Sequence, residues 1–300
     1  MKILVCDSIS KDAVKGIKDL GVEVTEKTSI EKDELADEIA NYDGIIVRSR
    51  TKVRSDLIDK TAGHLKFVIR AGVGLDNVDV EYAKRKGIEV INTPEASTNG
   101  VAELTIGHML ALLRKIPQGT ASMKKGQWIK KQLIGNELGS CVVGIIGLGR
   151  IGRRSAKLAH CFGATILGYD PYVKVELGLD VEMTELDDLL KRSDIISLHT
   201  PHNEETHHLI GKEELAKMKN SAYLVNCARG GLIDEDALYE ALKGGEIRGA
   251  ALDVFEEEPP KDSKLMELDN FICTPHLGAQ AVEAKNRVGE EVVKKVASRL

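Results

Sequence analysis

The chain has 300 residues, of which 42% are hydrophobic and only 4% aromatic, and it contains 28 glycines. Chains longer than about 250 residues usually divide into domains, and this composition excludes a fibrous or disordered protein and favours two α/β domains. The formal net charge of -5 gives no overall attraction to nucleic acid or to an anionic membrane, so we expect neither as a partner.

The cysteines and the apolar runs bear on where the protein works. The five cysteines are an odd number, include no Cys-x-x-Cys pair and lie mostly in apolar segments, which is typical of buried, reduced thiols. The apolar run at residues 1–6 is too short for a signal peptide, and no run of about eighteen apolar residues is present that could cross a membrane. We therefore expect a cytoplasmic protein.

The first part of the chain alternates short β-branched runs with helical stretches. Such alternation predicts a parallel sheet with helices on both of its faces. The predicted strands are residues 3–6, 22–25, 44–47, 66–70 and 88–91.

Residues 101–116 are apolar almost all round, with Ser97 or Thr98 available as a cap before them and Pro117 after them. This pattern predicts a buried helix that bridges two domains. The following polar stretch, residues 118–137, carries four lysines around the single tryptophan, Trp128, and its simplest interpretation is a solvated loop.

A second α/β series follows. Its predicted strands are residues 141–146, 164–168, 194–198, 222–225, 250–254 and 271–273, and a helix at 236–243 ends at a Gly-Gly pair. These strands predict a second parallel sheet. Valines and a leucine at helical spacing over residues 282–300 predict that the chain ends in an amphipathic helix.

A glycine motif, Gly147-Leu148-Gly149-Arg150-Ile151-Gly152, follows a predicted strand and opens a helix that runs towards Phe162. Glycines allow a tight turn and a close approach to a pyrophosphate, which the helix N-terminus attracts. Asp170 lies eighteen residues beyond the motif, where a carboxylate can bind both ribose hydroxyls. Because no arginine follows it, we expect NAD and not NADP; a simple turn former is the alternative for Asp170.

Three later segments, residues 226–231, 251–259 and 274–278, each follow a predicted strand. Ligands bind beyond the carboxyl ends of parallel strands, so Arg229, Glu258 and His276 are expected to converge beside a nicotinamide. Taken singly, each has an ordinary alternative: a surface arginine, part of a solvated acidic turn and a turn histidine.

Together with the glycine motif, these segments resemble the D-isomer-specific 2-hydroxyacid dehydrogenases over essentially the whole chain. Further matching segments are Val47-Arg48-Ser49, residues 70–79, Thr93-Pro94, residues 102–104 and His199-Thr200-Pro201. The resemblance implies an α/β fold of two Rossmann-like, doubly wound parallel-sheet domains with a cleft between them. An NAD-binding domain at 97–278 would be inserted into a flavodoxin-like, substrate-binding domain made of 1–96 and 279–300.

The resemblance also implies roles for the three residues. Arg229 would bind the substrate carboxylate and polarise its 2-oxygen, His276 would be the acid/base, and Glu258 would orient the imidazole. The chemistry suits these residue types, because histidine titrates near neutrality and the arginine fork matches a carboxylate and keeps its charge.

Further contacts come from the resemblance alone. It implies that Thr200 contacts the dinucleotide, that Cys227 and Asp253 lie against the nicotinamide amide, and that Gly278 also belongs to the cofactor site. It also implies a homodimer or higher homo-oligomer, with the 118–137 stretch as an arm that brings Lys130 or Lys131 to a partner subunit.

The implied substrate is a small 2-hydroxy acid, and within the family the resemblance is greatest to the branch that oxidises D-3-phosphoglycerate in serine biosynthesis. Its substrate site would use Arg48, Arg70, Gly72 and Val73, with Arg50 as a further cation nearby. Longer members carry C-terminal regulatory domains that this sequence does not match, which argues against feedback by serine; a truncated piece of a longer protein is the alternative.

Two other functions stay open. A glyoxylate or hydroxypyruvate reductase uses the same three residues, and an NAD-sensing corepressor that binds protein partners shares the fold.

Among the other histidines, His108 lies in an apolar helix and is interpreted as structural. His202, His207 and His208 share a polar loop without a helical ligand pair, so no metal is expected.

Overall fold

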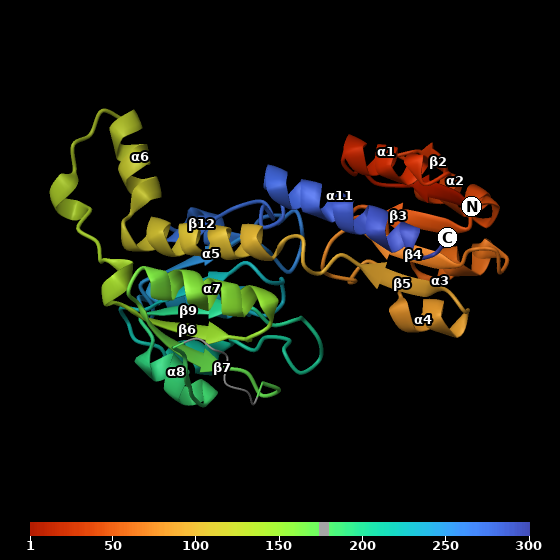
Figure 1. Ribbon diagram of the computed structural model, residues 1–300. Helices are drawn as coiled ribbons and strands as arrows, with labels where there is room; N and C mark the ends of the chain where they lie inside the picture. Colours follow the sequence, from red (N-terminus) through yellow and green to blue (C-terminus); the bar gives the residue numbers. More distant parts are fainter. Residues whose placement is uncertain (174–179) are drawn as a thin grey trace. The chain divides into compact units, whose positions relative to one another are not determined.

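A computed structural model describes residues 1–173 and 180–300 of the chain (Figure 1). These residues form two compact units, Met1–Thr98 with Ala279–Leu300 and Asn99–Gly278. Each unit contains one sheet in which every strand pair is parallel. The predicted α/β class with two parallel sheets is therefore confirmed.

The smaller unit has a five-stranded sheet in the order β2-β1-β3-β4-β5. Its strands are β1 (Lys2–Val5), β2 (Glu23–Glu26), β3 (Gly44–Val47), β4 (Phe67–Arg70) and β5 (Glu89–Asn92). Its helices are α1 (Lys11–Asp19), α2 (Lys32–Glu38), α3 (Ser55–Ile58), α4 (Val80–Arg85) and α11 (Val282–Ala297), with 3₁₀ turns at Ile39–Asn41 and Asp59–Thr61.

The C-terminal helix α11 belongs to this smaller unit, as its apolar stripe explains. Val288, Val292 and Val296 recur at every fourth position and are buried in one cluster with Ile17 of α1. A Cβ at Gly16 would lie 3.0 Å from a Val293 methyl, so glycine lets the two helices pack closely. The two ends of the chain therefore share one hydrophobic core.

The larger unit has a seven-stranded sheet in the order β12-β11-β10-β9-β6-β7-β8. Its strands are β6 (Val142–Ile146), β7 (Thr165–Tyr169), β8 (Glu182–Met183), β9 (Ile195–Leu198), β10 (Tyr223–Asn226), β11 (Gly249–Leu252) and β12 (Phe271–Cys273). Its helices are α5 (Thr98–Leu113), α6 (Ile116–Lys124), α7 (Arg150–Cys161), α8 (Leu186–Arg192), α9 (Lys212–Lys217) and α10 (Glu235–Gly244), with 3₁₀ turns at Lys130–Gln132, Leu138–Ser140 and Lys264–Glu267.

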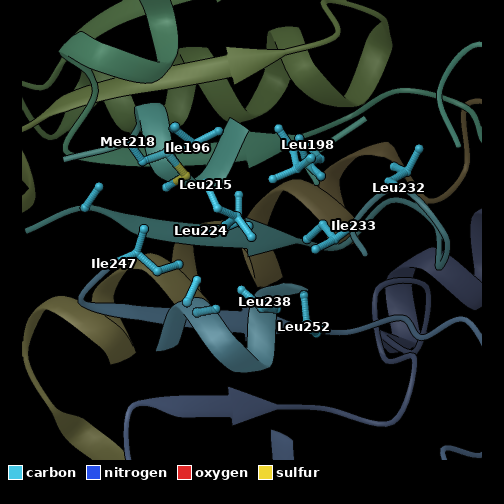
Figure 2. Close-up of a cluster of buried hydrophobic side chains, with 14 of the residues drawn as sticks. Ile196, Leu198, Leu215, Met218, Leu224, Leu232, Ile233, Leu238, Ile247 and Leu252 are labelled. Atoms are coloured by element: carbon cyan, nitrogen blue, oxygen red, sulfur yellow. The ribbon is translucent and has the colours of Figure 1, made fainter. Parts of the chain in front are cut away.

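The central strands of this sheet, β6, β9, β10 and β11, are buried on both faces, as expected for a parallel sheet covered by helices. Ile145 and Ile146 are neighbours on β6 and point to opposite faces, so they belong to two different hydrophobic clusters. Figure 2 shows one of these clusters, in which Ile196, Leu224 and Leu252 come from three adjacent strands. Packing of apolar side chains on both faces holds the strands in place, and therefore also the strand ends at which the loops begin.

Two local predictions were wrong. The predicted helix 101–116 begins earlier and ends at Leu113. A second helix, α6, starts at Ile116 and contains Pro117, because proline is tolerated in the first turn. Residues up to 124 of the predicted loop are therefore helical. The short strand β8 had no signal, since two residues are too few for a pattern.

None of the helices in the described part of the chain has the length and apolar character needed to span a bilayer.

Candidate active site

The glycine motif forms the turn between β6 and α7. Gly147 has a φ of +91°, and a Cβ there would lie 2.8 Å from the His199 carbonyl carbon. A Cβ at Gly152 would lie 1.9 Å from the Gly147 carbonyl oxygen. Gly149 is different, because its φ is -68° and a Cβ on it would meet nothing within 4 Å among the described residues. The packing of the protein explains two of the three glycines, and the third leaves room for a ligand.

The start of α7 is suited to an anion. The helix begins at Arg150, followed by Ile151, and no side chain of the described residues caps it, so its first N–H groups point outward. The Thr200 hydroxyl, beside Gly147, is buried and has no hydrogen-bond partner within residues 1–173 and 180–300. Free donors, open space at Gly149 and an unsatisfied hydroxyl together fit the pyrophosphate of a dinucleotide.

Asp170 follows β7 and ties it to this turn. Its carboxylate accepts the Leu148 N–H at 2.7 Å and the Tyr172 N–H at 2.9 Å. The Tyr172 hydroxyl in turn donates to Glu205 at 2.6 Å, a contact that no sequence pattern indicated. The Asp170 carboxylate is thus held next to the glycine turn.

His276 and Glu258 form a hydrogen-bonded pair, with 2.8 Å between His276 Nδ1 and Glu258 Oε2. The other Glu258 oxygen accepts the Phe255 N–H at 3.3 Å. The two side chains are 48% and 38% exposed, so the pair is accessible. Burial raises the pKa of Glu258, but the hydrogen bond to His276 and the charges of His276 and Arg229 outweigh it, and the pKa lies below its ordinary value.

Arg229 lies in the loop after β10, the strand next to β11. Asn226 shapes this loop, since its amide donates to the Arg229 carbonyl at 2.8 Å and accepts the Ala228 N–H at 3.0 Å. A Cβ at Gly230 would lie 1.8 Å from the Phe255 carbonyl, so the loop runs directly against the segment that leads to Glu258. The structure therefore brings the three predicted residues to one edge of the sheet.

The loop that carries His276 is organised by Asp253, which is fully buried at the end of β11. Its carboxylate accepts the Thr274 hydroxyl at 2.5 Å, the Leu277 N–H at 2.7 Å and the Gly278 N–H at 2.9 Å. Its backbone carbonyl accepts the His276 N–H at 2.9 Å. His276 has a φ of +52°, in the left-handed region that residues other than glycine rarely adopt.

Other predicted residues of this unit have clear environments. Cys227 follows β10 and is buried, which raises the pKa of its thiol to about 12 and keeps it neutral. His199 lies under the glycine turn with its Nε2 3.0 Å from the Ser197 hydroxyl, and burial lowers its pKa to about 4.

The four other histidines that the sequence analysis considered fall into two groups. His108 is buried on α5, with its Nε2 3.0 Å from the Thr274 hydroxyl. His202 and His207 are hydrogen-bonded at 3.1 Å, and His208 contacts Glu256 at 2.9 Å. In the part of the chain that the structure describes, no three potential ligands are grouped so as to hold a metal.

In the smaller unit, the predicted arginines lie at the carboxyl ends of adjacent strands. Arg48 directly follows β3 and Arg70 ends β4, with Arg70 opposite Val47 in the register. The Arg70 guanidinium donates to the Ser49 hydroxyl at 3.1 Å. A Cβ at Gly72 would lie 1.5 Å from that guanidinium. Because glycine has no side chain, the Arg70 guanidinium can occupy this space. The next residue, Val73, is partly buried and its carbonyl accepts the Asn92 amide at 2.6 Å.

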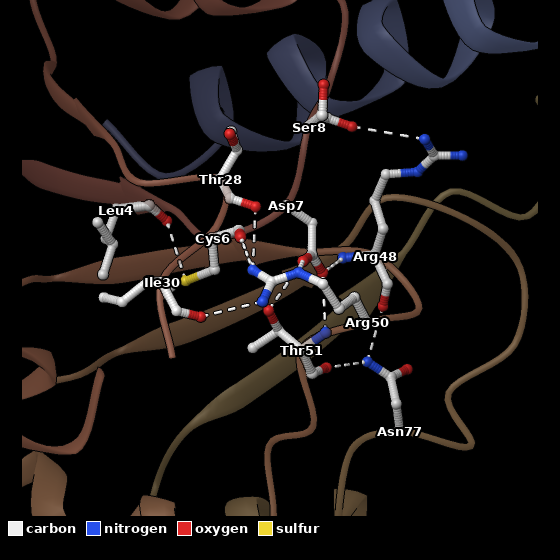
Figure 3. A network of polar contacts seen from close by, with 10 residues as sticks. All are labelled: Leu4, Cys6, Asp7, Ser8, Thr28, Ile30, Arg48, Arg50, Thr51 and Asn77. Atoms are coloured by element: carbon white, nitrogen blue, oxygen red, sulfur yellow. Dashed lines mark hydrogen bonds and ion pairs between the residues drawn. The ribbon is translucent and has the colours of Figure 1, made fainter. Parts of the chain in front are cut away.

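A buried carboxylate, Asp7, holds the loop that carries Arg48 (Figure 3). It accepts the Arg48 N–H at 2.6 Å, the Arg50 Nε–H at 3.1 Å and the Thr51 hydroxyl at 2.9 Å. The other Arg50 donors bind the carbonyls of Cys6, Thr28 and Ile30. Arg50 is therefore structural, whereas the Arg48 guanidinium points away from Asp7 and makes a 3.4 Å contact with the Ser8 carbonyl.

Comparison with known proteins agrees with this geometry. Residues 106–278 match the family model described as "D-isomer specific 2-hydroxyacid dehydrogenase, NAD binding domain". The chain is 52% identical to D-3-phosphoglycerate dehydrogenase of Methanocaldococcus jannaschii, over 99% of this chain and 57% of that protein. It is 49% identical to hydroxypyruvate reductase of Thermotoga maritima, over 98% of this chain and 97% of that protein.

A solved structure agrees as well. The D-lactate dehydrogenase of Aquifex aeolicus, in complex with NAD and lactic acid, superposes with a TM-score of 0.87 at 34% identity, over all of this chain and 95% of the other. The chain spans only a little more than half the length of the phosphoglycerate dehydrogenase relatives that it matches. With the family model covering more than half of its residues, the chain belongs to the D-isomer specific 2-hydroxyacid dehydrogenase family and contains the NAD-binding domain of that family.

Proposed function

We propose that this protein is an NAD-dependent dehydrogenase that oxidises D-3-phosphoglycerate to 3-phosphohydroxypyruvate, the first step of serine biosynthesis. The observation that carries the proposal is the 2.8 Å His276–Glu258 pair, which shares one sheet edge with Arg229 and the dinucleotide turn. Residues 97–278 would bind the cofactor, and the unit made of 1–96 and 279–300 would bind the substrate. The name of the M. jannaschii relative supports the choice of substrate.

His276 is the proposed acid/base. During oxidation the hydrogen on C2 leaves as a hydride, and NAD⁺ supplies its acceptor. The proton of the C2 hydroxyl moves to Nε2 of His276, since Glu258 occupies Nδ1. Glu258 fixes the tautomer that can accept this proton and then stabilises the imidazolium, and its lowered pKa keeps it ionised for both tasks.

Arg229 and the cofactor residues complete the proposal. Arg229 would bind the substrate carboxylate through its planar fork and polarise the 2-oxygen. Asp170 would bind both hydroxyls of the adenosine ribose, and its charge would repel a 2′-phosphate, so NAD is favoured over NADP. The glycine turn and Thr200 would hold the pyrophosphate, while Cys227, Asp253 and Gly278 would line the nicotinamide end.

The phosphate of the substrate is assigned to the smaller unit. Arg48 and Arg70 come from adjacent strand ends, and both are partly accessible. Gly72 and Val73, in the turn after β4, would contact the substrate through backbone groups. Arg50 is left out of this site, because its donors are used by Asp7 and by three backbone carbonyls.

A reductase acting on hydroxypyruvate or glyoxylate is the second candidate, favoured by the T. maritima relative that matches over nearly its full length. The deciding experiment compares NADH-dependent reduction of 3-phosphohydroxypyruvate, hydroxypyruvate and glyoxylate. A preference of about a hundredfold for the phosphorylated acid, or roughly 2.7 kcal/mol, supports our assignment. Equal or faster rates with hydroxypyruvate or glyoxylate would instead identify the protein as a reductase of these small acids. Tight NADH binding with no turnover of any of them would indicate a corepressor.

We also propose that the protein works as a cytoplasmic homodimer or higher homo-oligomer through the segment that contains α6. This segment exposes large apolar side chains that a monomer would leave in water, namely Ile116, Met123, Trp128 and Ile134, which are 53% to 78% exposed. Lys130 or Lys131 would then reach the partner's substrate. Light scattering of the wild type and of a Trp128→Glu, Ile134→Glu variant tests this: a monomeric wild type contradicts it.

A further inference from the structure

A chain of hydrogen bonds, His108–Thr274–Asp253, joins helix α5 to the loop that carries His276. The Nε2 of His108 lies 3.0 Å from the Thr274 hydroxyl oxygen, which lies 2.5 Å from Oδ1 of Asp253. His108 is 5% exposed and Asp253 is 0% exposed, whereas Thr274 between them is partly buried. This hydrogen-bonded chain links His108 and Thr274, which are 166 positions apart in the sequence.

The chemistry of the groups sets the direction of each bond. The Asp253 carboxylate is an acceptor, and the Thr274 hydroxyl, which has one proton, donates it to Oδ1. The hydroxyl oxygen can then only accept from the imidazole, so His108 carries its proton on Nε2. Burial lowers the pKa of His108, against a smaller opposing effect of Asp253, so the ring is neutral and exists as this one tautomer.

The hydrogen-bonded chain ends at Asp253, which holds the loop of the proposed acid/base. Asp253 also accepts the backbone N–H groups of Leu277 and Gly278, and its carbonyl accepts the N–H of His276. His276 stands in the left-handed region, where a residue with a side chain stays only if its surroundings hold it. A shift of Asp253 would therefore move three backbone groups around His276 at once.

We propose that His108 is a positioning residue of this enzyme: through Thr274 it fixes the Asp253 carboxylate and thereby the left-handed backbone that presents His276 to the substrate. The inference rests on the proposed role of His276 as the acid/base. An apolar side chain would fill the same space in α5 but would leave the Thr274 hydroxyl without its donor.

Kinetics of paired variants give the first test. His108→Leu and Thr274→Val break the chain, whereas His108→Gln keeps a donor at the Nε2 position and Thr274→Ser keeps the hydroxyl. We expect kcat for reduction of the best 2-keto acid to fall about tenfold in the first pair, with the KM for NADH changed less than about twofold. The Gln and Ser variants should recover most of the loss.

Leu112→Ala is the matched control, because Leu112 lies one turn further along α5, is buried in the hydrophobic core and has no polar group for the hydrogen-bonded chain. It should lower the melting temperature and leave kcat near that of the wild type at 25 °C. If it lowers kcat as much as His108→Leu does, or if His108→Leu keeps the full kcat, the proposal is wrong.

A second measurement does not depend on turnover. The ¹⁵N shifts of the His108 ring should report a proton on Nε2, and the amides of Leu277 and Gly278 should exchange with solvent faster in His108→Leu than in the wild type. A proton on Nδ1, or unchanged exchange at both amides, would overturn the proposal. Absence of turnover in the wild type would instead refute the proposed function, while the exchange data would still decide whether His108 holds the loop.

Discussion

The two parallel sheets end in loops that use one structural device for different purposes. Each has a buried carboxylate just after a strand that holds a neighbouring loop in place, Asp253 after β11 in the larger unit and Asp7 close after β1 in the smaller. In the larger unit the held loop presents a histidine, and in the smaller unit it presents an arginine. The difference teaches that the fold holds the loop in place, while the residue type on the held loop sets its chemistry: a titratable ring in the larger unit and a fixed positive charge in the smaller one.

The titratable groups differ in the same way. Seven of the eight histidines lie in residues 99–278, and the smaller unit has only His64, which is exposed. Acid–base chemistry and sensitivity to pH should therefore belong to the larger unit. Selectivity between substrates should belong to the arginines of the smaller unit. Each half of this comparison can be tested separately.

The largest effect is expected from His276→Ala. Loss of the acid/base should lower kcat in both directions by about a thousandfold, because general acid–base catalysis contributes on the order of 10²–10⁴. Steady-state rates measure this, and NADH binding followed by fluorescence should change little. A residual activity above about a tenth of the wild type would contradict the assignment. The pH profiles of oxidation and reduction should slope in opposite directions, because one needs the neutral ring and the other the protonated ring.

The arginines of the smaller unit should change selectivity and leave the chemical step alone. We expect Arg48→Ala or Arg70→Ala to raise the KM for 3-phosphohydroxypyruvate about thirtyfold, since a hydrogen bond between charged groups contributes roughly 2 kcal/mol. The KM for glyoxylate should stay nearly constant, and equal effects on both acids would remove the phosphate assignment. Arg50→Ala is the contrast: it should lower the melting temperature without a selective change in KM.

Buried His199 should make the larger unit sensitive to acid. Its pKa is about 4 in the folded state against about 6.5 in an unfolded chain, so the unfolded state binds the extra proton as the pH falls through this window. The free energy of unfolding should keep its full value above pH 6.5, and the titration of His199 should lower it by about 2 kcal/mol at pH 5. Urea titrations at pH 7, 6 and 5 give the free energy of unfolding of the wild type and of His199→Gln. This free energy should fall less with decreasing pH in the variant. The same fall in both proteins would show that the His199 ring does not titrate as expected.

The smallest effect concerns the cofactor. Asp170→Asn keeps an acceptor for the Leu148 N–H and removes the charge. We expect the ratio of kcat/KM with NADH to that with NADPH to fall about tenfold, because one repulsive charge beside a 2′-phosphate contributes on the order of 1 kcal/mol. A ratio that does not change would mean that Asp170 is only a structural link between β7 and the glycine turn.

The sequence by itself determined the elements and the motifs that depend on local spacing. Alternating β-branched runs and helical stretches predicted both sheets, since burial on two faces leaves an apolar run wherever a strand lies. The glycine motif and the three segments that carry Arg229, Glu258 and His276 were visible because each follows such a run. Residue type and position along one stretch of chain are enough for inferences of this kind.

Only the tertiary structure decided which of these residues touch. The His108–Thr274 contact joins two distant segments, and nothing in the apolar helix distinguishes a histidine with a partner from a core residue. Arg48 and Arg50 are two positions apart and look alike in sequence, yet backbone carbonyls engage only Arg50 fully. Hydrogen bonds act over about 3 Å, and packing of elements from separate parts of the chain sets such distances, which is why the sequence alone could not predict them.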